Sequence, residues 1–253
     1  MDRLIFTSNS AIKEQATARQ VLVNDLANVS TTGFKSSYNV ALTTVKADGP
    51  GFDTRYQSQA VSKDQIRMTS GAIMATGKPT DIAMAGQTVL AVQAGNGELA
   101  YTRRGDLRVN INGQLENGAG HLVMGQGGPV TVPAGVQLSI NPDGSVFGRD
   151  PNQPNNAPAV LIDRLRIKDG SAIQFERRED GLFKVSGQAP GSDFTSGPVT
   201  PQVIPSALEG SNVSGIEALT RLMDFSRTFE TQIKIIKETK GIDESGSSMI
   251  KAQ

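Results

Sequence analysis

The 253-residue sequence contains no cysteine, no tryptophan and a single histidine, His121. Without cysteine there can be no disulfide bond, thiolate metal ligand or cysteine nucleophile. One histidine excludes a multi-histidine metal site and leaves a Ser-His-Asp triad dependent on His121 alone. Because His121 follows Gly118-Ala119-Gly120, we interpret it as a polar residue at the start of a strand. We therefore expect no catalytic residues, no metal site, no cofactor and no enzyme activity.

The sequence also lacks an excess of charge and a long apolar run. Lys and Arg total 25, and so do Asp and Glu, so no long-range field would attract nucleic acid. No stretch approaches the roughly 20 apolar residues that span a bilayer. Near the N-terminus the apolar run Leu4-Ile5-Phe6 is shorter than the core of a secretory signal. We expect no nucleic-acid partner, no direct membrane span and no cleavable Sec signal.

The middle of the chain has the alternation of β-strands. Leu107, Val109 and Ile111 alternate with polar residues, and Asn112-Gly113 follows as a tight hairpin signal. Comparable short segments are separated by the 27 glycines and 12 prolines of the chain. Many short strands between such turns favour an antiparallel barrel or sandwich. Residues 46–64 hold Asp48-Gly49-Pro50-Gly51 and predict a long loop or extended arm.

The N-terminal segment has helical periodicity instead. Apolar residues recur at Ile5, Ile12, Val23 and Leu26 on one face of an amphipathic helix. Asn28, Ser30, Thr31 and Thr32 have poor helix propensity, so the helix should end near Ala27 or Asn28.

A second helix is predicted near the C-terminus. Ser214 stands three residues before Glu217, the spacing of a capping box that starts a helix. A seam of apolar residues then steps by three and four, and Gly241 should end the helix. The seam contains Leu219, Leu222, Phe229, Ile233 and Ile236.

These patterns predict an α+β fold with an all-β middle domain and terminal helices that form a coiled-coil-like domain. Both stripes are wider than a two-stranded seam requires, and small residues such as Ala11 and Ala16 permit close approach of further helices. We expect an assembly interface between subunits. Alternatively, the helices simply cover their own β domain. The expected interface residues are Ile5, Ile12, Val23, Leu26, Leu219, Leu222, Phe229, Ile233 and Ile236.

Three blocks of sequence resemble the flagellar rod and hook proteins. The segment Asn24-Asp25-Leu26-Ala27-Asn28-Val29-Ser30-Thr31-Thr32-Gly33-Phe34-Lys35 is similar to the N-terminal signature of that family. Leu208-Glu209-Gly210-Ser211-Asn212-Val213-Ser214 resembles the lead-in to its C-terminal helix. Between them, Thr76-Gly77-Lys78-Pro79-Thr80-Asp81 and Tyr101-Thr102-Arg103-Arg104-Gly105 are similar to its β domain. The motif residues are Asn24, Leu26, Ala27, Asn28, Thr31, Gly33, Phe34 and Lys35.

The resemblance implies a structural axial subunit of the basal-body rod, most similar to the proximal rod members. It implies three regions: a terminal helical domain of residues 1–35 with 214–253, an extended linker domain of 36–74 with 201–213, and an outer β domain of 75–200. It also implies helical assembly with copies of itself and with other proximal and distal rod subunits, forming part of a drive shaft and export channel. The location would be the periplasmic rod, reached through the flagellar type III export apparatus.

Two other hypotheses stay open on the sequence. One is a distal rod or hook subunit, which differs only in its place along the axis. The other is a β-domain binding module that uses its terminal helices to form a closed oligomer. An enzyme built on His121 is the least favoured.

Overall fold

The computed structural model describes residues 2–37, 41–46, 56–61, 65–151 and 158–251, and it divides into two compact units. The helical unit comprises residues 1–27, 39–63 and 214–253. The β unit comprises residues 28–38 and 64–213. The chain therefore passes from one unit to the other close to the ends of both helices. The division into three domains predicted from the sequence stays a prediction.

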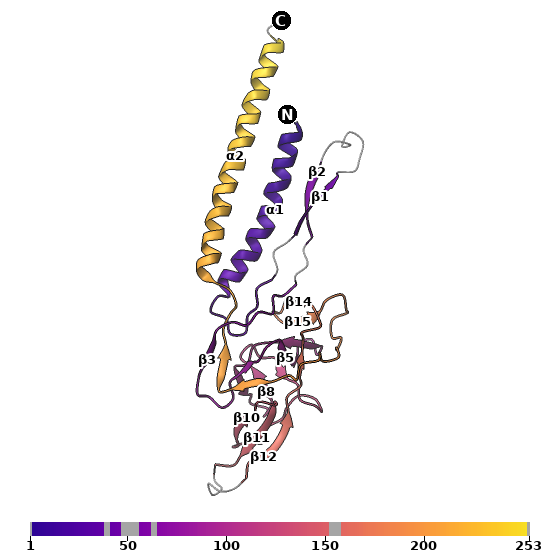
Figure 1. Ribbon diagram of the computed structural model, residues 1–253, viewed down its shortest axis with the longest axis vertical. Coiled ribbons are helices and arrows are strands. Elements are labelled where there is room, and N and C mark those ends of the chain that lie inside the picture. The colour runs from indigo at the N-terminus through magenta and orange to yellow at the C-terminus, as the bar shows by residue number, and fades with distance from the viewer. Residues whose placement is uncertain (1, 38–40, 47–55, 62–64, 152–157, 252–253) are drawn as a thin grey trace. The chain divides into compact units, whose positions relative to one another are not determined.

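The helical unit contains two long helices and one hairpin. Helix α1 spans Asp2–Ala27 and helix α2 spans Gly215–Lys251. They lie side by side in opposite directions, with the two chain ends at the same end of the pair (Figure 1). Strands β1 (Ala41–Lys46) and β2 (Tyr56–Val61) pair antiparallel, and β2 lies alongside α1. Of the two alternatives predicted for residues 46–64, a long loop or an extended arm, the loop was wrong at β2. Residues 47–55 and 62–64 lie outside the described part.

Two helix ends predicted from the sequence are confirmed. Helix α1 ends at Ala27, where the turn-forming residues begin. At the start of α2 the hydroxyl oxygen of Ser214 accepts a hydrogen bond from the backbone N–H of Glu217 at 3.4 Å. This contact satisfies one of the backbone donors that a helix start leaves unpaired.

The prediction that Gly241 ends the second helix was wrong, because α2 continues to Lys251. A glycine inside a helix costs about 1 kcal/mol relative to alanine, which neighbouring contacts can offset. Lys240 and Glu244 stand one turn apart with 3.5 Å between Nζ and Oε1, and the Ser245 hydroxyl donates to the Gly241 carbonyl at 2.8 Å. Gly241 does not adopt the left-handed conformation in which a glycine commonly ends a helix.

The β unit is built from short antiparallel strands. Its largest sheet has eight strands in the order β14-β15-β6-β5-β9-β8-β7, with β13 also paired to β5. Three smaller sheets have the orders β10-β11-β12, β16-β4 and β17-β3. The strands are β3 (Ile73–Ala75), β4 (Ile82–Met84), β5 (Thr88–Gln93), β6 (Leu99–Thr102), β7 (Leu107–Val109), β8 (Leu115–Asn117), β9 (Leu122–Val123), β10 (Gln137–Ile140), β11 (Ser145–Arg149), β12 (Val160–Arg164), β13 (Ile167–Asp169), β14 (Phe175–Arg177), β15 (Phe183–Val185), β16 (Val203–Pro205) and β17 (Ala207–Glu209).

Strand β5 lies at the centre of the unit because both of its faces are buried. Leu90 and Val92 pack into one apolar cluster, with Ile82 and Val123. Val89 and Ala91, which point to the opposite face, pack into a second cluster around Phe175. A strand buried on both faces has a continuous apolar run instead of alternation, as Val89–Val92 shows.

The all-β middle is confirmed, but the barrel alternative was wrong for the described strands. Strands β14 and β7 stand at opposite ends of the large sheet and do not pair, so the sheet is open. The predicted hairpin at Asn112-Gly113 is present, although β7 ends at Val109 and Ile111 is exposed in the turn. There the Asn110 side-chain oxygen accepts the N–H groups of Asn112 and Gln114 at 2.9 Å, and Gly113 has a φ of +76°. Among the described helices, neither is apolar enough over a sufficient length to cross a bilayer.

Candidate assembly interface

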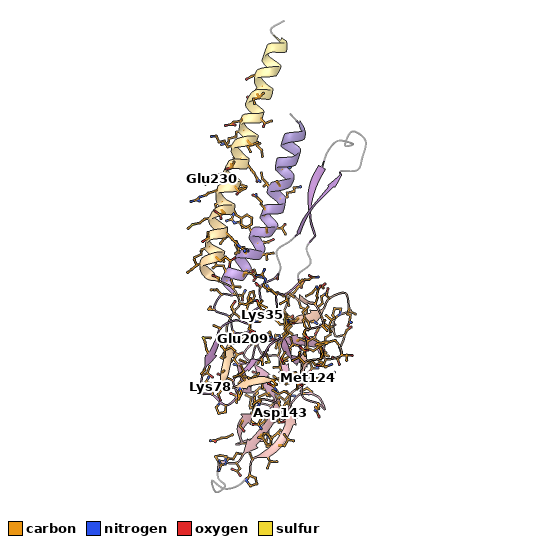
Figure 2. All side chains as sticks on the ribbon, in the orientation of Figure 1. Lys35, Lys78, Met124, Asp143, Glu209 and Glu230 are labelled. Carbon is orange, nitrogen blue, oxygen red and sulfur yellow. The ribbon has the colours of Figure 1, made fainter. Side chains whose placement is uncertain are left out.

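A groove of about 740 Å³ runs between α1 and α2 within the helical unit. Its walls are mostly apolar, and Arg19 from α1 and Glu230 from α2 add one charge of each sign. Glu230 marks this part of α2 in Figure 2. The lining residues are Ile12, Gln15, Ala16, Thr17, Arg19, Gln20, Val23, Phe225, Ser226, Phe229 and Glu230. An apolar groove between two helices can bind the apolar face of another helix.

The structure brings two predicted interface residues of α1 into this groove. Ile12 and Val23 line it, and Val23 is exposed although it is apolar. Leu26 is half-buried near the end of the helix, and the Ile5 side chain lies outside the described part. Among the described side chains of α1, the buried apolar one is Leu22, which belongs to an adjacent line of the predicted amphipathic face but not to the expected interface residues.

The predicted seam of α2 is divided between two environments. Leu222, Ile233 and Ile236 are half-buried, whereas Leu219 is half exposed. Phe229 lines the groove and is 46% exposed. The seam therefore does not describe one continuous buried face of the single chain. Whether these residues contact other subunits stays a prediction.

Sequence reasoning missed several apolar residues of α2. Phe225 lines the groove, and its spacing of three from Leu222 and four from Phe229 could have identified it. Ile216 and Met223 are 82% and 64% exposed on a different side of the helix. They are seven residues apart, a spacing that keeps two side chains on nearly the same side. A single seam was too narrow a description of this helix.

The second half of the predicted motif belongs to the β unit. Thr31 follows the helix end, and its N–H and hydroxyl donate to the backbone and side-chain oxygens of Asn28, each at 3.1 Å. Gly33 has a φ of +69°, and a Cβ there would stand 2.4 Å from the carbonyl oxygen of Arg103. Only glycine fits this approach. The Arg177 guanidinium lies 4.4 Å from the centre of the Phe34 ring.

Lys35 ends the motif and is fully buried. Its Nζ lies 2.6 Å from Oε1 of Glu209, and it also donates to the carbonyl oxygen of Thr69 at 2.9 Å. The two side chains stand together in the β unit in Figure 2. Burial and the nearby Arg103 cation lower the pKa of Lys35, while its contact with Glu209 opposes that change.

Arg103 completes this buried cluster. Its Nε lies 2.7 Å from Oε2 of Glu209, and neither side chain reaches solvent. The remaining guanidinium nitrogens donate to the carbonyl oxygens of Met84, Gly86 and Thr88 at 2.8, 2.7 and 3.1 Å. Each of the three guanidinium nitrogens therefore donates at least one hydrogen bond, and a buried guanidinium requires such partners. The cluster joins three separate blocks of the family resemblance.

His121 does not stand in a catalytic arrangement. Its backbone N–H donates to the Asn117 side chain at 3.0 Å, and its buried Nδ1 has no partner among the described residues. Burial lowers the pKa of His121, and the Asp180 carboxylate opposes this change. The described residues contain no group of three His, Asp or Glu side chains placed to hold a metal ion.

Two family models match parts of the chain. Residues 83–148 match the family described as the flagellar hook protein FlgE/F/G D1 domain, and residues 204–249 match the C-terminal region of flagellar basal body rod FlgEFG proteins. The chain is 36% identical over 239 residues to the flagellar basal-body rod protein FlgF of Salmonella typhimurium, with 93% of each chain covered. The chain belongs to the flagellar basal-body rod protein family. It is also 35% identical to FlgF of Escherichia coli K12, again over 93% of each chain.

The family assignment identifies the chain as a structural rod subunit of the FlgF type. Similarity to FlgG is lower: the FlgG protein of Agrobacterium fabrum is 26% identical over 256 residues, which cover 92% of this chain and 94% of that protein. The predicted basal-body location is supported by these relatives, and a rod subunit assembles with other rod or hook subunits. The predicted resemblance is thereby confirmed.

Proposed function

We propose that this rod subunit assembles helically through the α1–α2 pair, which contributes to the drive shaft and export channel of the proximal rod. The observation that carries the proposal is the distribution of apolar side chains around α2. Phe229 faces the groove, Ile216 and Met223 occupy a second side, and Ile235 and Ile242 occupy a third. At 100° per residue these three sides are separated by roughly 120°.

One neighbouring helix can cover only one of these sides. All five side chains are at least 39% exposed in the single chain, and Ile242 is 56% exposed. Apolar side chains on three sides of one helix are all removed from water only when several partners surround the helix. Copies of this chain and the other rod subunits are the proposed partners, because the chain belongs to a rod family.

The helices could instead form the coiled-coil-like domain of a closed oligomer. Three apolar sides favour the open assembly, because each helix then requires neighbours in several directions. Location in the periplasm and passage through the flagellar type III export apparatus also belong to this proposal. They follow from assembly in the rod.

The test is the assembly of the purified chain, followed by light scattering and electron microscopy. We expect helical polymers that grow with concentration, and a discrete oligomer of fixed mass would support the binding-module alternative. Met223→Asp and Ile242→Asp should each prevent polymer growth, because each places a charge on a separate apolar side. Thr220→Asp is the matched control, since Thr220 is exposed and lies in line with Glu238, midway between the second and third apolar sides.

A further inference from the structure

Two segments that connect the units lie side by side inside the β unit. The N–H of Gly33 donates to the carbonyl oxygen of Glu209 at 2.7 Å, and the N–H of Asn212 donates to the carbonyl oxygen of Phe34 at 3.3 Å. The N–H of Ser36 donates to the side-chain oxygen of Asn212 at 2.7 Å. We call residues 33–36 together with 209–212 the junction clasp. Its two segments come from opposite ends of the chain.

Side chains fasten the clasp to the rest of the β unit. Lys35 joins Glu209 through a buried ion pair, and Glu209 also accepts the N–H of Gly71 at 3.0 Å. The amide nitrogen of Asn212 donates to the carbonyl oxygens of Arg67 and Thr69 at 2.9 and 3.3 Å. A buried charged pair and a fully used amide are costly to separate. The two segments are therefore held to each other and to the same loop.

The clasp changes the length of chain that separates the two helices. Helix α1 ends at Ala27, shortly before Gly33, and α2 begins at Gly215, shortly after Asn212. Through the clasp, the path between them is about ten residues. With the clasp open, the nearest remaining backbone links are the hydrogen bonds from Arg67 to the Ser36 carbonyl oxygen and from Gly210 to the Ala72 carbonyl oxygen, each at 2.8 Å. The path through them grows to about 20 residues, and loop closure becomes roughly threefold less favourable.

We propose that Lys35, Glu209 and Asn212 are positioning residues for the α1–α2 pair, which they hold together by closing the junction clasp. They touch neither the groove nor a second subunit in this role. Their effect is to raise the effective concentration of each helix at the other, so that the groove forms within one chain before a second chain arrives. The importance of the groove rests on the proposed function, but the closing of the clasp does not.

Thiol exchange measures this effective concentration directly. The chain has no cysteine, so Gln20→Cys and Ser226→Cys, which both line the groove, introduce the only two thiols. Equilibration of the dilute monomer with reduced and oxidised glutathione gives the effective concentration of the pair. We expect the Lys35→Met and Asn212→Ala double variant to lower it roughly threefold, and each single variant to lower it less. Lys35→Met leaves Glu209 paired with Arg103 and so avoids an unpaired buried carboxylate.

The matched control is Lys78→Met, because Lys78 is an exposed lysine of the same unit. It should leave the exchange equilibrium unchanged. The near-UV circular dichroism of Tyr101 and its aromatic neighbours reports whether the β unit stays folded. An unchanged effective concentration in the folded double variant would overturn the proposal. Loss of the near-UV signal in both single variants would also overturn it, because the three residues would then be part of the core and not a clasp. Both measurements are made on the monomer and do not require assembly. Failure of the clasp proposal is therefore distinguishable from failure of the proposed function.

Discussion

Arg103 and Glu209 form an ion pair with 2.7 Å between Nε and Oε2, and the two side chains are 0% and 1% exposed. Lys35 shares the same carboxylate, so one anion balances two buried cations. Removing the anion would leave both cations without a counter-charge in a medium that solvates them poorly. Glu209 is therefore the residue on which this cluster depends most.

Glu209→Gln should lower the free energy of unfolding of the β unit by about 3–5 kcal/mol, measured by urea titration. Glu116→Gln is the comparison, because Glu116 pairs with Arg108, whose side chain is largely exposed. That variant should change stability by less than about 1 kcal/mol. Equal losses in the two variants would show that the buried cluster contributes no more than a surface pair.

Gly33→Ala tests the close approach between the motif and Arg103, which directly follows β6. Alanine would meet the Arg103 carbonyl oxygen at 2.4 Å and would also have to hold a φ of +69°. Gly77→Ala is matched, since Gly77 has a φ of +73° and open space around it. Thermal unfolding should show a loss of about 1–2 kcal/mol for Gly77→Ala, from backbone strain alone. The loss for Gly33→Ala should be clearly larger, and equal losses would contradict the contact.

The sequence could predict the architecture because its signals are local. The alternation around Leu107, the spacing of Ser214 and Glu217, and the turn formers after Ala27 each act within a few residues. The sheet order could not be predicted in this way, because β5 pairs with β13, a strand some 75 residues later in the chain. Long-range pairing depends on the packing of both faces, which a single segment does not specify.

The candidate site was predictable only in part. The stripe of Ile12 and Val23 was visible, since both residues follow one helical period. The apolar sides that contain Met223 and Ile242 were not predicted, because the sequence was searched for a single seam and these residues fall outside it. Likewise, Lys35 and Glu209 are 174 residues apart, and nothing local indicates that they pair. The resemblance marked both residues as parts of motifs without indicating their contact.

Acid should weaken the β unit through Asp169. Burial alone would raise the pKa of this carboxyl, but hydrogen bonds from Ser171 and from the N–H of Val199 outweigh burial and lower the pKa below its ordinary value. A lowered folded-state pKa contributes stability above about pH 4, which is lost as the pH falls through the folded value. The melting temperature of the wild type should therefore fall more steeply than that of Asp169→Asn below about pH 4. Parallel curves would contradict this assignment.

Phe229→Asp and Ile233→Asp test the predicted seam of α2 in cells. Each variant should be exported yet fail to enter the rod, and motility should be lost, because a buried side chain worth about 1.5–3 kcal/mol is replaced by an unpaired charge at every subunit. The melting of the β unit should not change. Thr220→Asp, at an exposed position in line with Glu238 on another side of the helix, should preserve motility. Normal rods in the Phe229 and Ile233 variants would mean that α2 does not bind its neighbours through this face.

The central claim is that α2 contacts other subunits on sides that its own chain leaves open, and Met223 tests it most directly because it is 64% exposed in the single chain. A photo-crosslinking amino acid placed at position 223 can be activated in isolated basal bodies and in the dilute monomer. The account predicts a covalent adduct with a neighbouring rod subunit in basal bodies and none in the monomer. Incorporation into rods without any adduct between subunits at this position would contradict it.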